Sequence, residues 1–236
     1  MRVLVIPDIH LKPWIFERAS ELMQEGTADR AVCLMDIADD WNQELNLDLY
    51  ISTYDAAIKF AKDCPDALWC YGNHDICYLW NQRETGFSYF ALQTVCEKLR
   101  NLKDVLPQES QIAYIHRMND VLFSHGGLTD AFVKKHIPVS LYNKIDAVVD
   151  TVNELGLREM WQDMSPLWSR PQYSGERMYK PRKLLQVVGH TPVTQIEKKG
   201  NLISCDVFST YRDGSPIGTQ EFLLLDTMTW EYCGVR

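Results

Sequence analysis

The sequence predicts an α/β fold in which a parallel core sheet carries helices on its faces and a second, mixed sheet packs on the first. Apolar runs alternate with helical patterns in the first half, an order typical of parallel sheets. The second half is rich in short strands beside turn residues. With 236 residues and 46% apolar content, we expect one domain over residues 1–236. The alternating segments are 2–7, 14–25, 31–35, 49–62 and 67–71.

Each element of the first half follows from the spacing of its apolar residues. Residues 2–7 form a short apolar, β-branched run, as expected for a buried strand. In the next segment, Ile15, Ala19, Leu22 and Met23 recur at helical spacing on one face. The same reasoning predicts strands at 31–35 and 67–71, and helices at 49–62 and 88–102.

The second half predicts hairpins and one long irregular segment. We expect three pairs of strands and one single strand; turn residues such as Asn119-Asp120 and Gly200-Asn201 lie between the two strands of a pair. Residues 156–183 contain three prolines and several aromatics without periodicity, which indicates a loop or cap over a site. The remaining elements are strands at 111–116, 120–125, 184–189, 194–198 and 201–206, a helix at 142–155, and a closing hairpin at 221–225 and 229–233.

Composition excludes several classes of protein. The net charge of −8 and the lack of a Lys/Arg stripe disfavour a nucleic-acid binder. The seven cysteines are odd in number and form no Cys-x-x-Cys pair, so we expect reduced thiols in a reducing compartment. No run of 18 uncharged apolar residues occurs, and the short apolar N-terminus does not resemble a signal peptide. We therefore expect a cytoplasmic protein with no membrane partner.

Five polar clusters each follow a predicted strand. Because ligands bind at the carboxyl ends of strands in open α/β sheets, we expect the clusters to share one crevice. Their Asp, His and Asn donors suit Mn²⁺, Fe or Zn²⁺, and six donors fit two metals that share a bridging carboxylate. Taken singly, each cluster is also explained as a helix cap, a turn or a core histidine. The clusters are Asp8-Ile9-His10, Asp36-Ile37-Ala38-Asp39, Gly72-Asn73-His74-Asp75, His125-Gly126-Gly127 and Gly189-His190-Thr191-Pro192.

This set of clusters resembles the calcineurin-like metallophosphoesterase superfamily, whose pattern is Asp-x-His, Gly-Asp-x-x-Asp, Gly-Asn-His-Asp/Glu, Gly-His and Gly-His. His190-Thr191-Pro192 and Trp168-Ser169-Arg170-Pro171 are similar to its phosphoprotein phosphatase and symmetrical diadenosine tetraphosphatase branch. Cys205-Asp206-Val207 looks like the closing strand of that branch. The fold we expect is an α/β four-layer αββα sandwich of two mixed sheets flanked by helices.

The resemblance implies a role for each matched residue. His74 would be the general acid, oriented by Asp39, and Arg170 would clamp the phosphate as a bidentate ligand. Two divalent metal ions would activate a water; Mn²⁺ is expected first, while Fe, Zn²⁺, Ni²⁺ and Co²⁺ also suit the donors. The first metal would be held by Asp8, His10 and Asp36, and the second by the bridging Asp36 with Asn73, His125 and His190, of which Asn73 would also contact substrate.

The second cluster departs from the branch at two positions. Met35 replaces a glycine, from which we expect a change in packing only. Asp40 replaces an arginine and would place a repulsive anion near the phosphate if its side chain pointed inward. This second departure weakens the inference of a phosphatase-branch substrate.

The predicted function is metal-dependent hydrolysis of a phosphate ester, with a phosphomonoesterase resembling protein serine/threonine phosphatases ranked first. The substrate would be a phosphoprotein, a small phosphate ester or a nucleotide. The runner-up is symmetrical hydrolysis of a dinucleoside polyphosphate, for which aromatics of 156–183 would stack a purine; the alternative is that these side chains pack the cap onto the domain. A non-catalytic binding protein of the same fold ranks lower, because every ligand position, His74 and Asp39 are intact. The aromatics are Trp161, Trp168, Tyr173 and Tyr179.

Overall fold

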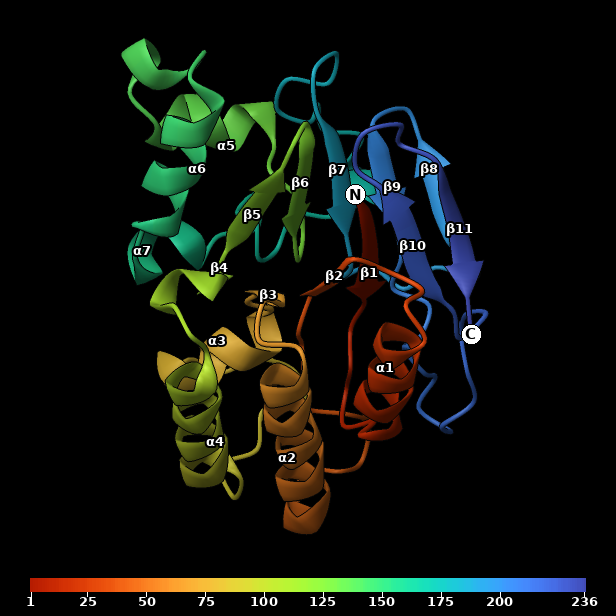
Figure 1. Cartoon of the computed structure of the whole chain (residues 1–236). Coiled ribbons are helices and arrows are strands. Elements are labelled where there is room, and N and C mark those ends of the chain that lie inside the picture. Colours follow the sequence, from red (N-terminus) through yellow and green to blue (C-terminus); the bar gives the residue numbers. More distant parts are fainter.

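The computed structural model describes residues 1–236 and arranges the chain as two sheets between helices (Figure 1). One sheet has six strands in the order β11-β10-β1-β2-β3-β4, and the other has five in the order β5-β6-β7-β9-β8. The strands are β1 (Arg2–Ile6), β2 (Arg30–Cys33), β3 (Leu68–Cys70), β4 (Ile112–Ala113), β5 (Ile115–Met118), β6 (Val121–Ser124), β7 (Leu185–Val188), β8 (Glu197–Lys199), β9 (Leu202–Ser204), β10 (Phe222–Asp226) and β11 (Tyr232–Val235).

Eight α-helices and two short 3₁₀ turns, at Glu109–Gln111 and Val139–Leu141, complete the fold. Side-chain caps fix two helix starts: Asn46 accepts from the Leu49 amide, and Thr129 accepts from the Phe132 amide. The α-helices are α1 (Trp14–Gln24), α2 (Leu47–Asp63), α3 (Asn73–Leu79), α4 (Leu92–Val105), α5 (Asp130–His136), α6 (Ile145–Asn153), α7 (Leu157–Met160) and α8 (Pro171–Ser174).

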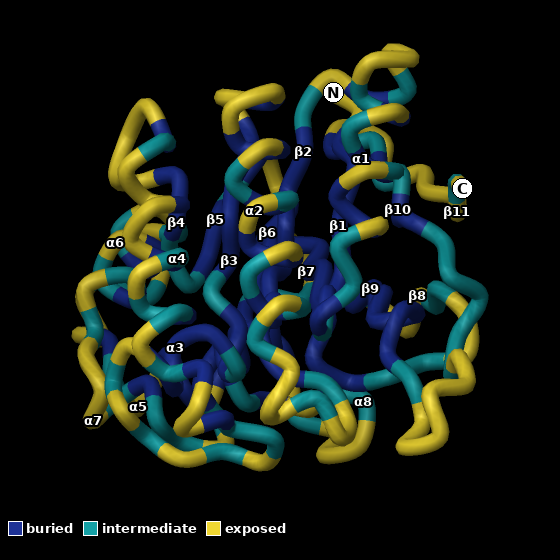
Figure 2. The backbone as a smooth tube through the Cα atoms, turned by 90° about the horizontal axis from the view of Figure 1, so that it is seen from below, coloured by how far each residue is buried: buried dark blue, intermediate teal, exposed yellow.

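The alternation of side chains along β1 separates two apolar layers. Leu4 and Ile6 face a core shared with α1, α2 and α4, whereas Val3 and Val5 face the second sheet. All four side chains are fully buried, and the tube through the central strands is correspondingly dark in Figure 2, whereas the edge strands β8 and β11 are more exposed. The strand therefore lies at the centre of the fold, with a helical layer on one side and a sheet on the other.

A third apolar cluster covers the outer face of the second sheet. Ile115 and Leu122 of that sheet pack with Phe132 of α5 and Val148 of α6, and Figure 1 shows these helices beside β5 and β6. The three apolar clusters thus lie between four successive layers, which are helices, the first sheet, the second sheet and helices. The predicted α/β four-layer αββα sandwich of two mixed sheets is confirmed.

Several predicted elements differ in detail from the structure. The closing hairpin joins the first sheet, where β10 pairs antiparallel with β1, rather than the second. The strand predicted at 111–116 is divided at Tyr114, so that β4 pairs with β3 and β5 pairs with β6. The helices α3 and α5 were not predicted, because each has only seven residues and too few turns to display a helical period.

No helix of the structure is both long enough and apolar enough to cross a lipid bilayer.

Candidate metal centre and active site

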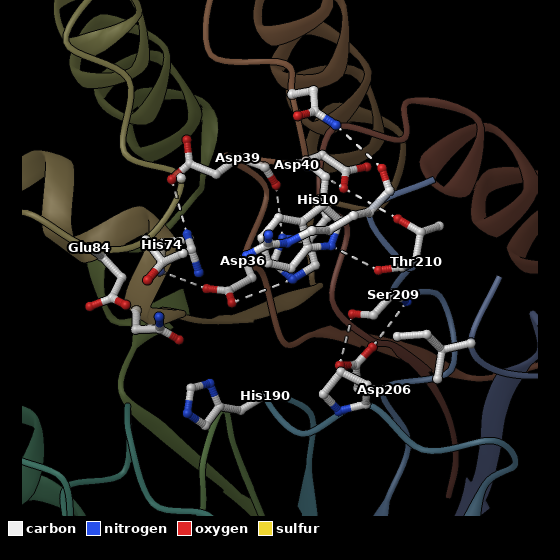
Figure 3. A pocket seen from close by; sticks show the side chains of 18 of the residues that line it. His10, Asp36, Asp39, Asp40, His74, Glu84, His190, Asp206, Ser209 and Thr210 are labelled. Atoms are coloured by element: carbon white, nitrogen blue, oxygen red, sulfur yellow. Dashed lines mark hydrogen bonds and ion pairs between the residues drawn. The ribbon is translucent and has the colours of Figure 1, made fainter. Parts of the chain in front are cut away.

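Six parallel strands of the two sheets end at one edge, and a functional side chain follows each of them. In the first sheet, β1, β2 and β3 are parallel neighbours; in the second, β6, β7 and β9 are. The two sheets thus bring residues from distant parts of the chain to one cavity of about 570 Å³, drawn in Figure 3. The site residues that follow these strands, each within six positions of the strand end, are Asp8 and His10, Asp36 and Asp39, Asn73 and His74, His125, His190, and Asp206.

Two glycines permit the close approach of the strand ends. A Cβ on Gly72 would lie 1.9 Å from the Asp36 carboxylate, and a Cβ on Gly189 would lie 2.1 Å from the Asp8 carboxylate. No other residue fits at either position without moving the carboxylate. These glycines directly precede Asn73 and His190. Each Gly-ligand pair in the sequence therefore supplies one ligand and also leaves space for the carboxylate of another, Asp36 beside Gly72 and Asp8 beside Gly189.

The first group of donors consists of Asp8, His10 and Asp36. One donor atom of each lies within 4.8 Å of the others. The Nδ1–H of His10 donates to the backbone oxygen of Asp39 at 2.9 Å, because a carbonyl oxygen can only accept. The neutral ring therefore keeps its Nε2 lone pair for the cavity, where it faces Asp36.

The second group consists of Asp36, His125 and His190. His125 donates from Nδ1 to the Leu34 oxygen at 3.0 Å, which leaves its Nε2 to face the other donors of the group. That Nε2 lies 2.9 Å from Asn73 Oδ1, 3.1 Å from His190 Nδ1 and 3.1 Å from Asp36 Oδ2. One ring nitrogen cannot satisfy three such partners, whereas a cation between them would satisfy all four atoms.

The charges in the cavity favour cations. Burial lowers the pKa of both His10 and His190, so these rings are neutral and offer a lone pair. Burial also acts to lower the pKa of His125, but the nearby Asp36 and Asp8 carboxylates outweigh it and raise that pKa to about 9. For Asp36, burial is outweighed by His125 and His74, and its pKa falls below the usual value. Two divalent ions fit this donor set of carboxylates, imidazoles and one amide oxygen.

The loops that carry the ligands hold left-handed backbone conformations. His10, Asp36 and His190 have φ values of 44°, 46° and 59°, a region that non-glycine residues seldom occupy. Met35, fully buried, has φ 56°. The expectation that Met35 changes packing only is therefore incomplete, since this position needs the conformation that the glycine of the resembling pattern adopts freely.

His74 and Asp39 form a hydrogen-bonded pair at the cavity wall. His74 Nδ1 lies 3.0 Å from Asp39 Oδ2, so Nε2 is the nitrogen left to meet a substrate. The backbone amide of His74 donates to Asp36 Oδ1 at 2.9 Å, which fixes the ring relative to the ligands. Burial acts to lower the pKa of His74, but Asp36 and Asp39 outweigh it and raise that pKa to about 9.

Arg170 lies on the cavity wall against the ligand loop that carries His190. Its Nη1 donates to the His190 backbone oxygen at 2.6 Å and to Thr191 Oγ1 at 3.3 Å. These contacts hold the guanidinium at the edge of the cavity, where its side chain is exposed. The position is suited to contact an anionic group beside the metal ligands.

Asp40 faces the cavity, but its charge is compensated. Lys12 Nζ donates to its Oδ2 at 3.0 Å, and Thr210 Oγ1 donates to its Oδ1 at 3.3 Å. The Asp40 carboxylate is about one-fifth exposed. A paired, fixed carboxylate thus occupies the place of the arginine in the resembling branch, and Figure 3 shows it beside Thr210 on the rim.

Two buried carboxylates were not assigned a role by sequence reasoning. Asp75 accepts from the amides of Asp36 and Ile37, at 2.7 and 3.0 Å, and so ties one ligand loop to the next. Asp206 follows β9 and lines the cavity, where it accepts from Ser209. The signal for Asp206 was present, because the residue ends the apolar run predicted as a strand at 201–206.

The aromatics of 156–183 are mostly unavailable to a ligand. Among the four, only Trp168 lines the cavity. Tyr179 is fully buried, Tyr173 is 74% exposed, and Trp161 packs edge-on against Trp168 at 5.0 Å. Tyr179, Trp161 and Trp168 pack this segment onto the third apolar cluster, which is the alternative to purine stacking, and the segment places Trp168 and Arg170 at the cavity.

Comparisons with known proteins agree with this arrangement. A family model described as calcineurin-like phosphoesterase matches residues 1–215. The cold-active protein-tyrosine phosphatase of the psychrophile Shewanella sp. is 15% identical, with a TM-score of 0.58 over 100% of this chain and 80% of that one. A hypothetical protein of Pyrococcus horikoshii is 14% identical, with a TM-score of 0.53 over 100% and 87%. At such identities, the likeness shows a shared fold. No curated protein sequence matches the chain.

Proposed function

The chain belongs to the calcineurin-like phosphoesterase family and is a hydrolase of phosphoric ester bonds; from that premise, we propose that it is a phosphomonoesterase with a dinuclear metal centre. The observation that carries the proposal is the pair of donor groups that share Asp36, one with Asp8 and His10 and the other with His125 and His190. Asn73 Oδ1 adds a fourth donor to the second group, which makes six donor residues in the whole site. A shared carboxylate between two such groups is suited to two adjacent cations.

The side chains around the ligands divide the work of hydrolysis. When bound, the divalent cations stabilise charge on the phosphoryl oxygens and lower the pKa of water. Arg170 binds a non-bridging phosphate oxygen from the edge of the cavity. His74, held through Nδ1 by Asp39, donates a proton from Nε2 to the oxygen of the departing alcohol. The Asp39 carboxylate accepts from Nδ1, and against the opposing effect of burial Asp36 and Asp39 raise the pKa of His74 to about 9, so the ring is an imidazolium that also carries the Nε2 proton to be donated.

The charge of the cavity favours a substrate with a single phosphate. Beyond the ligands, the cavity wall carries Asp40, Glu44 and Glu84, against Arg170 and Arg212. The Glu44 and Glu84 carboxylates, unlike the compensated Asp40, would repel a chain of several phosphates. The alternative, symmetrical hydrolysis of a dinucleoside polyphosphate, is supported only by Trp168 as a surface for stacking. A phosphoprotein or a small phosphate ester fits the charges better.

We also propose Mn²⁺ as the native metal and the cytoplasm as the compartment. The mixture of carboxylate, imidazole and amide donors suits Mn²⁺, with Fe, Zn²⁺, Ni²⁺ and Co²⁺ as the ions to compare. Five of the seven cysteines are buried as free thiols and Cys96 is partly buried, and burial raises the pKa of their thiols, as for Cys70. Such inert thiols are typical of a reducing compartment.

The test is a substrate comparison with the full chain. We expect hydrolysis of p-nitrophenyl phosphate with added Mn²⁺ to be abolished by EDTA and restored by Mn²⁺. The same preparation is then assayed with bis(p-nitrophenyl) phosphate, phosphoserine and phosphotyrosine peptides, mononucleotides and diadenosine tetraphosphate. Faster turnover of the monoesters supports the proposal, whereas preference for the diester or for the dinucleotide contradicts it.

A variant separates metal binding from proton donation. His74→Asn is expected to lose about 10²-fold or more in kcat on p-nitrophenyl phosphate, the scale of general acid catalysis, while elemental analysis finds unchanged metal content. Undiminished kcat in this variant would remove the acid role of His74. Loss of metal together with activity would instead make His74 part of the metal centre.

A further inference from the structure

Two buried tyrosines hold the carboxylate that orients the proton donor. The hydroxyls of Tyr50 and Tyr78 both donate to Asp39 Oδ1, at 2.7 and 2.5 Å, while Asp39 Oδ2 faces His74 Nδ1. Figure 3 shows the Asp39–His74 pair at the cavity wall, with the carboxylate pointing away from His10 and Asp36 toward the helices. Both phenol rings are buried, with exposures of 0% and 1%.

The directions of these hydrogen bonds are determined. Asp39 is deeply buried, and its pair with His74 and its two phenol donors leave it no freedom to rotate. Tyr78 accepts the backbone amide of Ser88 at 2.8 Å, so its own proton is the one given to Asp39. Burial, together with Asp39, raises the pKa of both phenols, so both keep their protons.

The two tyrosines come from different helices and connect the pair to the surrounding structure. Tyr50 lies in α2 and Tyr78 in α3. Phe87 stacks on the Tyr78 ring at 4.4 Å. A Cβ added to the neighbouring Gly86, which has φ 86°, would lie 3.4 Å from the Asp39 side chain. Asp39 is thus enclosed by two helices and one loop, although only its second oxygen serves His74.

We propose that Tyr50 and Tyr78 are positioning residues for proton transfer to the leaving group, because their hydroxyls hold Asp39 in the orientation that aims His74 at the departing oxygen. The proposal rests on the proposed phosphomonoesterase function. Neither tyrosine touches substrate or metal donors. Without one hydroxyl, the carboxylate is free to turn, and the imidazole loses the fixed hydrogen bond that sets its ring plane.

The leaving group provides a readout that a purely structural role would not change. Dinitrophenolate departs without a proton, whereas phenolate from phenyl phosphate is more basic and requires one. We expect Tyr50→Phe and Tyr78→Phe each to lower kcat on phenyl phosphate by about 10-fold or more. On 2,4-dinitrophenyl phosphate, the same variants stay within about 2-fold of wild type, with unchanged metal content.

Tyr54→Phe is the matched control. Tyr54 lies one turn after Tyr50 in the same helix, is equally buried, and donates at 3.2 Å to a different carboxylate, Asp75. Its loss therefore reproduces the removal of a buried phenol hydroxyl without touching Asp39. Whatever this variant loses in kcat, we expect it to lose equally on phenyl phosphate and on 2,4-dinitrophenyl phosphate.

Double variants test whether the effect of each tyrosine depends on His74. In a His74→Asn background, Tyr50→Phe and Tyr78→Phe are expected to cause no further selective loss on phenyl phosphate, because the donor they position is gone. Equal losses on both substrates, no loss, or an added selective loss in the His74→Asn background would each overturn the positioning role. Tyr78→Phe carries the test by itself if Tyr50→Phe does not fold. A wild type without activity toward any monoester would instead refute the proposed function.

Discussion

Replacing Gly72 by alanine is the most direct test of the shared carboxylate. A Cβ at this position would lie 1.9 Å from Asp36 Oδ1 and 2.7 Å from the Asp36 backbone nitrogen, whereas ordinary contacts begin at 3.4 Å. The carboxylate must therefore move by about 1.5 Å, and the backbone of the ligand loop must shift with it. Metal–ligand distances tolerate only about 0.2 Å. We therefore expect Gly72→Ala to fold, at a cost of about 1–3 kcal/mol for overpacking, but to lose metal at both positions.

The expected loss of activity follows from the same displacement. A misplacement of about 1 Å in an active site can cost about 10²-fold in rate, so we expect kcat/KM on p-nitrophenyl phosphate to fall by at least about that factor. Elemental analysis after dialysis measures the metal, and circular dichroism checks the fold. Gly156→Ala is the control, because its Cβ would meet no atom nearer than 4.0 Å. Two metals per chain and near-normal turnover in Gly72→Ala would refute the geometry.

Three further perturbations test separate parts of the structure. Asp36→Asn removes the bridging charge and should lower metal content at both positions; unchanged stoichiometry would contradict the bridge. Arg170→Lys keeps the charge but loses the planar fork, and kcat/KM should fall by about 10-fold; an equal value would exclude a bidentate contact. Burial lowers the pKa of His116 to about 4, although its ring donates to the Trp69 oxygen. The unfolded chain therefore binds the proton first, and stability should fall by about 3 kcal/mol between pH 6.5 and 4. His116→Gln should remove that part of the pH dependence in urea unfolding, and an unchanged slope would show that His116 does not cause it.

The sequence by itself determined the layers of the fold and the residue types at the site. The continuous apolar run of β1 and the helical period in α1 indicate which side chains are buried, and these signals are local. The clusters after the strands were equally visible, since each polar residue directly follows an apolar run. Short helices such as α3 were not predicted from the sequence, because the motif Gly72 to Asp75 at its start has no apolar period and the helix has only seven residues.

Tertiary structure alone decided how those residues act. The pairing of Asp40 with Lys12 spans 28 positions, and that of Tyr78 with Asp39 spans 39; neither follows from local spacing. The left-handed backbone at Met35 is likewise set by neighbouring strands and not by the methionine itself. Periodicity reports burial, whereas the partner of a buried polar group depends on which strand ends meet, and only the folded chain brings them together.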